Sequence, residues 1–226
     1  MRQGRLADTR DMFAMHTMFR REYGNTPDLV RAARVGDLHR ATVVADHIAL
    51  LNHVLHGHHT AEDKYLWPLL LERVGAELAP IVLVMEEQHT RIHHGYVRLN
   101  MALAAWREDA SARARAAVAR ALDELVPVLE THLSLEEERV VPLIERHLSR
   151  EEYARAGKEG IAHNPPDAVP VIVGMLMYES DLETIDGVIA ALPADLRLVI
   201  RDLSVAAYAS YAQKLYGTAM PPRVLT

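Results

Sequence analysis

The chain of 226 residues contains no cysteine. Disulfide bonds, thiolate zinc sites and cysteine-ligated iron–sulfur clusters are therefore excluded, so any metal must be held by nitrogen and oxygen donors. Aromatic residues are also scarce, at 5% of the chain, whereas Ala, Leu and Val dominate. Because these residues favour helices over sheets, the composition predicts an all-α protein.

Other absences limit the partners. No segment approaches the roughly 18 uninterrupted apolar residues of a membrane span, and we expect no contact with membranes. No N-terminal stretch joins a charged start to an apolar run, so we expect no signal peptide. The net charge of −6 argues against nucleic acid as a partner, since a phosphate-binding surface normally carries a basic bias. A cytoplasmic protein is the simplest expectation.

The first two thirds of the chain read as helices with short connections. The main helices are expected at 6–24, 36–73, 80–107 and 111–147, with a short helix ending near residue 35. Gly24-Asn25-Thr26-Pro27 is expected to interrupt the first helix, and Pro127 to kink the last. Four such segments predict an up-and-down antiparallel four-helix bundle.

Beyond Ser149 the chain changes character. A loop is expected at 161–166, followed by helices at 168–179, 181–191 and 194–215. We therefore predict two units, a bundle at 1–149 and a C-terminal helical extension at 150–226. The extension is expected to pack on the bundle or on a partner subunit, so an oligomer formed through these helices stays open.

Histidines and carboxylates recur at helical spacing along the bundle. Three pairs are four residues apart: His58/Glu62, His89/His93 and His132/Glu136. Residues i and i+4 lie one above the other on a helix face, so each pair can direct two donors at one point. This pattern predicts metal binding between helices, most readily of two ions.

The two halves of the bundle also look like a repeat. A shift of 74 residues aligns His58 with His132, Glu62 with Glu136 and Pro68 with Pro142. A shift of 73 aligns His16 with His89. Arg20 then stands where the second half has His93, so the second half offers three histidines and the first offers two.

The predicted donor set comprises His16, His58, Glu62, His89, His93, His132 and Glu136. Five imidazoles and two carboxylates suit a pair of first-row metals, with iron favoured over manganese or zinc. His89, His93 and His132 would saturate one ion, and the carboxylates would bridge the two. His16 and His58 would leave the other ion an open position, where dioxygen, peroxide or nitric oxide would bind.

These residues, in this order, resemble the hemerythrin family, in particular the bacterial HHE cation-binding domains. The likeness covers about residues 8–148 and rests on the seven donors named above. It implies a non-haem di-iron centre in a four-helix bundle, with an oxo or hydroxo bridge. It also implies reversible oxygen binding, or redox chemistry on oxygen or nitric oxide.

The sequence departs from the oxygen carriers of that family at two points. The carriers place the last carboxylate five residues after its histidine, which would indicate Glu137, whereas the internal repeat favours Glu136. His59 stands where the carriers have an apolar residue. A polar group beside a bound gas favours redox defence or sensing over simple carriage.

Two other functions stay open at this point. The chain is alternatively an iron-binding or iron-sensing module without turnover, or a structural protein whose donors hold zinc. Peroxidase or nitric-oxide-processing activity is compatible with the donor set, but the sequence does not decide whether turnover occurs.

Overall fold

The computed structural model describes residues 6–75 and 78–223, so the outermost residues of the two predicted units, 1–5 and 224–226, lie outside it. The prediction of an all-α fold is confirmed. Within the described ranges the chain forms helices joined by short connections, and the β structure there is confined to one isolated bridge between Leu6 and Ser149.

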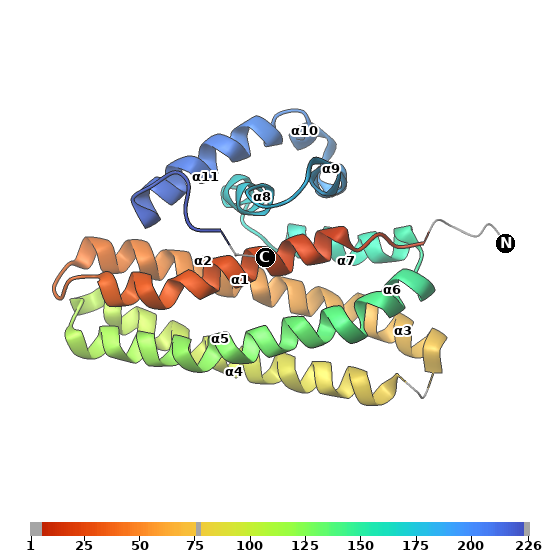
Figure 1. Ribbon diagram of the computed structural model, residues 1–226, viewed down its shortest axis with the longest axis horizontal. Helices are drawn as coiled ribbons and strands as arrows, with labels where there is room; N and C mark the ends of the chain where they lie inside the picture. The colour runs from red at the N-terminus through yellow and green to blue at the C-terminus, as the bar shows by residue number, and fades with distance from the viewer. Residues whose placement is uncertain (1–5, 76–77, 224–226) are drawn as a thin grey trace.

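Four long antiparallel helices form the bundle, as predicted (Figure 1). They are α1 (Arg10–Ala32), α2 (Leu38–Ala61), α4 (Ala79–Asp109) and α5 (Ala112–Arg139). Asp37 and Ser111 cap α2 and α5 by accepting hydrogen bonds from the backbone N–H three residues on. These caps fix where the helices that carry the donors begin.

The predicted interruption at residues 24–27 is wrong, because α1 runs through Pro27 without a break. A proline inside a helix lacks the N–H that would bond the carbonyl four residues earlier, here that of Tyr23. The Thr26 hydroxyl donates to this carbonyl at 2.7 Å and replaces the missing bond. Thr26, which lies in the segment expected to interrupt the helix, therefore helps the helix to continue.

The ends of α2 and α5 confirm the internal repeat. After Ala61 the chain passes through a π-helical turn, η1 (Glu62–Leu66), into the short helix α3 (Trp67–Val74). Likewise α5 gives way at Val140 to α6 (Val141–His147). Pro68 and Pro142 each stand in the first turn of these short helices, where a missing N–H is harmless. The single helix predicted for 111–147 is thus interrupted at Val140, beyond Pro127.

The C-terminal extension lies along the α1–α2 side of the bundle (Figure 1). Its helices are α7 (Arg150–Ala162), α8 (Val169–Met177), α9 (Leu182–Ala191), α10 (Ala194–Arg197) and α11 (Ile200–Tyr216). The sequence interpretation missed α7, which starts with a capping box between Ser149 and Glu152. It also predicted one helix at 194–215, where α10 and α11 are separate.

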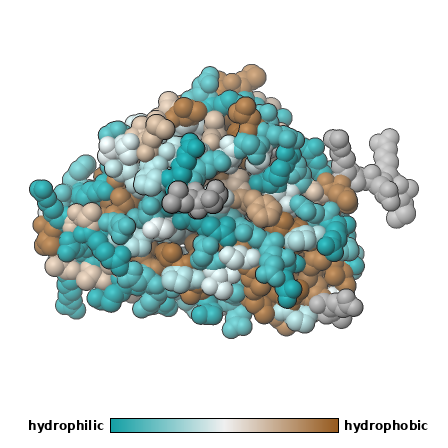
Figure 2. Space-filling model, in the orientation of Figure 1, coloured by the Kyte–Doolittle hydropathy of each residue, from teal (hydrophilic) through white to brown (hydrophobic). Residues whose placement is uncertain are grey.

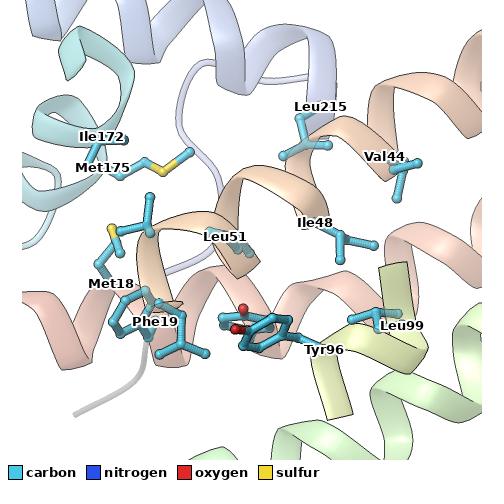
Figure 3. Close-up of a cluster of buried hydrophobic side chains, with 14 of the residues drawn as sticks. Met18, Phe19, Val44, Ile48, Leu51, Tyr96, Leu99, Ile172, Met175 and Leu215 are labelled. Atoms are coloured by element: carbon cyan, nitrogen blue, oxygen red, sulfur yellow. The ribbon is translucent and has the colours of Figure 1, made fainter. Parts of the chain in front are cut away.

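One hydrophobic core joins the extension to the bundle. Met18 and Phe19 of α1 lie in the same buried cluster as Ile172 and Met175 of α8 and Leu215 of α11 (Figure 3). A second cluster, which includes Trp67 and Ile144, fills the end of the bundle around α3 and α6. The extension therefore packs on the bundle, while its status as a separate domain stays a prediction.

The visible face of the molecule mixes hydrophilic and hydrophobic side chains (Figure 2). In the part of the chain that the structure describes, no helix is both long enough and apolar enough to cross a membrane.

Candidate metal centre

Two groups of buried donors face each other inside the bundle. The first consists of His16, His58, Glu62 and Glu136, and the second of His59, His89 and His132. Within each group, one donor atom from every residue lies within 4.8 Å of the others. All of these residues are buried except His58, whose side chain is 12% exposed. Each group therefore has the compactness that a metal ion requires.

The two carboxylates of the first group also contact the second group. Glu62 places one oxygen 3.1 Å from His58 Nε2 and the other 3.6 Å from His89 Nε2. Glu136 Oε2 lies 3.4 Å from His16 Nε2 and 3.7 Å from His132 Nε2. Each carboxylate thus contacts a histidine of both groups, which is the placement of a bridging ligand.

Three of the histidines are oriented by acceptors on the outer side of the cluster. His16 Nδ1 is 2.9 Å from Glu137, and His89 Nδ1 is 2.7 Å from Asp63. His132 Nδ1 is 3.1 Å from the side-chain oxygen of Gln88. An outer acceptor fixes the tautomer in which Nδ1 carries the proton, which leaves Nε2 free to bind a metal.

The inward-facing atoms test whether a metal fits. Among the described residues, the Nε2 atoms of His59, His89 and His132 and both oxygens of Glu62 and Glu136 are buried without a hydrogen-bond partner. Leaving so many buried polar atoms unpaired is costly, and native proteins rarely do so without a reason. A cation between them would satisfy these atoms together, so the residues present fit a metal.

The electrostatics of the cluster agree with this reading. Burial lowers the pKa of His58 to about 3 and of His132 to about 4. These imidazoles are neutral at pH 7, and a metal needs that form. Burial and the nearby Glu136 carboxyl raise the pKa of Glu62 well above its usual range. Burial also opposes the charge on Glu136, but the adjacent His16 ring, at 3.4 Å, outweighs this and lowers the pKa of Glu136.

His93 is the one predicted donor that the structure does not bring to the cluster. It is exposed, and its Nδ1 lies 2.5 Å from the Tyr96 hydroxyl. The buried stripe of α4 alternates steps of three and four residues, and it passes from His89 to Ile92 and Tyr96. His93, four residues after His89, therefore lies on the flank of the helix.

His59 occupies the place that His93 was expected to fill. Its ring stacks on that of His89, with centroids 4.0 Å apart and planes 8° from parallel. Neighbouring residues on a helix point about 100° apart, so His58 and His59 reach different groups. The π-helical turn begins three residues later, and such turns often mark functional sites.

Glu136 and Glu137 have different surroundings. Glu136 is fully buried between the groups, whereas Glu137 binds His16 from outside and pairs with Arg20, whose Nη1 is 2.6 Å away. Arg20, at the position of the missing third histidine in the first half, thus supports His16 indirectly. This geometry favours Glu136 as the inner donor.

The comparisons with known proteins agree with the bundle and the cluster. Residues 8–144 match the family model of the hemerythrin HHE cation binding domain, and the chain belongs to that family. The chain has no match among curated proteins or among solved structures. The resemblance inferred from the spacing of the histidines is thereby confirmed, and the matched range ends within α6.

Proposed function

We propose that the chain binds two iron ions in the cluster and uses them to bind or process a small ligand, namely dioxygen, nitric oxide or peroxide. The observation that carries this proposal is the pair of donor groups linked by Glu62 and Glu136, whose carboxylate oxygens are buried and unpartnered. Nitrogen and carboxylate donors in a helical bundle suit iron, and the family supports a cation.

The two ions would have unequal surroundings. His59, His89 and His132 would give one ion three imidazoles, whereas His16 and His58 give the other only two. With both carboxylates shared, the second ion keeps an open position for a ligand. When bound, the iron pair would supply reversible electron exchange with that ligand. We therefore propose the same asymmetry as before, with His59 in place of His93.

The chain's own contribution is to orient the donors and to exclude water. Glu137, Asp63 and Gln88 hold the three oriented imidazoles with Nε2 inward. The buried cluster is covered on the α1–α2 side by the extension. We propose redox defence or sensing rather than carriage, because the extension covers the cluster on this side. His59 is itself a member of the second donor group, so the sequence-based argument that it is a polar group beside a bound gas does not apply.

Iron binding or iron sensing without turnover is the second candidate, favoured by the unpartnered buried carboxylates. Without a metal, Glu62 and Glu136 carry a large desolvation cost, so metal loss would loosen the bundle. A cytoplasmic location and an oligomer through the C-terminal helices remain proposals from the sequence.

A visible and near-ultraviolet spectrum of the iron-loaded protein, recorded before and after exposure to air, tests the leading proposal. We expect an oxygen-sensitive charge-transfer band that is lost in His58→Ala and kept in His39→Ala, an exposed histidine on the same helix. A band that also survives in His58→Ala contradicts the proposed site. Peroxide and nitric oxide, added to the reduced protein, then separate turnover from binding alone.

A further inference from the structure

A cavity of about 120 Å³ lies between the bundle and the extension. Its wall includes Met12 and Met15 of α1, Ala156 of α7 and Val173 of α8. It also includes His58, the most exposed member of the donor groups. The cavity therefore borders the first donor group, and residues of the extension form part of the cavity wall.

The wall of the cavity is chiefly apolar. Methionine, valine, isoleucine, leucine and alanine side chains form most of it, and none of its described lining residues is Lys or Arg. An ion that entered this space would lose its hydration with no lysine or arginine there to pair with it. The carboxylate of Asp11 already accepts a hydrogen bond from the Tyr153 hydroxyl at 2.7 Å. The chemistry of the wall thus selects for an uncharged, weakly hydrated molecule.

The size of the cavity narrows the choice further. Apolar cavities of about 150 Å³ in other proteins stay dry and bind benzene or xenon. Pockets that bind small molecules are typically lined by apolar side chains with few polar groups, as this one is. A molecule with a single aromatic ring, or a hydrocarbon of similar volume, matches both the wall and the space.

We propose that this cavity is a binding site for a small uncharged organic molecule of about the size of an aromatic ring. The occupant would sit beside His58, between α2 of the bundle and α8 of the extension. This proposal goes beyond iron and diatomic ligands, and its test does not depend on the redox state of the centre. It assigns the extension a function, which is to build a second binding site next to the metal centre.

Calorimetric titration of the full-length protein, as purified, with toluene tests the proposal. We expect toluene to bind at one site per chain. Val173→Phe and Val188→Phe should fill the cavity from α8 and α9 and weaken toluene binding by roughly tenfold or more. Val205→Phe, an exposed position on α11, is the matched control and should bind toluene as the wild type does.

Circular dichroism and metal content, measured on each variant, show that a loss of binding is not a loss of folding. Two filling variants on different helices are used so that one of them can fail to fold without ending the test. The proposal is overturned if toluene does not bind the wild type, or if a folded filling variant binds toluene unchanged. Failure of the iron spectrum, by contrast, would leave these titrations as they stand.

Discussion

The imidazole rings of His59 and His89 are stacked face to face, with centroids 4.0 Å apart, although they come from different helices, α2 and α4. The ring of His132 meets both edge-on, at 4.8 Å from His59 and 4.7 Å from His89. Three rings from three helices thus bring one ring nitrogen each to within 4.8 Å of the others. This arrangement defines the second donor group and explains why His59 belongs to it.

His59→Ala is expected to reduce the iron content, because it removes one of three imidazoles from that group. His93→Ala should leave the iron content unchanged, since His93 is exposed and contacts Tyr96. Metal analysis of both variants after growth with iron supplies the measurement. Retention of full iron in His59→Ala together with loss in His93→Ala would reverse the assignment.

Glu136→Gln and Glu137→Gln should separate an inner donor from an outer support. Glu136→Gln removes a carboxylate that contacts both groups. We expect this variant to bind fewer than two ions per chain. Glu137→Gln weakens only the orientation of His16, so iron affinity should fall by about 10–100-fold while the pair still forms at saturating metal. Competition with a chelator measures both affinities. The opposite order of effects would favour Glu137 as the inner donor.

His47 should make the protein less stable as the pH falls. Burial lowers its pKa to about 4, from an ordinary value of about 6.5. Between these values the unfolded chain takes up a proton that the folded chain does not, so the free energy of unfolding decreases on acidification. The contribution is at most about 3 kcal/mol over the whole window.

His47→Gln should therefore flatten the decline of the thermal midpoint between pH 6.5 and pH 5. The control is His39→Gln, an exposed position on the same helix, which should keep the wild-type decline. A decline that is equally steep in all three proteins would show that the protonation of His47 does not contribute.

Gly174→Ala is expected to separate α8 from α11. A methyl group at this position would lie 2.5 Å from both the Ser204 carbonyl oxygen and Tyr208 Cβ. Such overpacking typically costs about 1–3 kcal/mol, and the thermal midpoint should fall accordingly. Gly187→Ala on α9, where nothing lies within 4 Å, should leave the midpoint unchanged or raise it slightly. Equal midpoints for the two variants would contradict the close packing of α8 on α11.

The sequence predicted the bundle because periodic apolar positions and helix caps act locally. His58/Glu62 and His132/Glu136 were found because their spacing places both side chains on one helix face, and the structure places all four in the two donor groups. The pair His89/His93 has the same spacing, but the buried stripe of α4 continues through Ile92 instead. Which of two residues faces the core depends on packing against other helices, and spacing alone does not show this.

The helices and the cavity around the site were harder to predict from the sequence. The helix α7 carries two glycines and few apolar residues, so its pattern is weak, although Ser149 and Glu152 gave a usable capping signal. The helix α1 continues through Pro27 with a local hydrogen bond from the Thr26 hydroxyl to the Tyr23 carbonyl, although the same residues are also typical of a helix start. The cavity beside His58 arises from residues of separate helices, and no local pattern predicts it.

The measurement that tests the central claim most directly is the amount and identity of metal per chain in protein purified from iron-supplemented growth. Two irons per chain, falling in His59→Ala and unchanged in His93→Ala, are the result predicted from the two donor groups. Stoichiometric zinc, or no stoichiometric metal at all, would contradict the claim that these buried histidines and carboxylates form a di-iron centre.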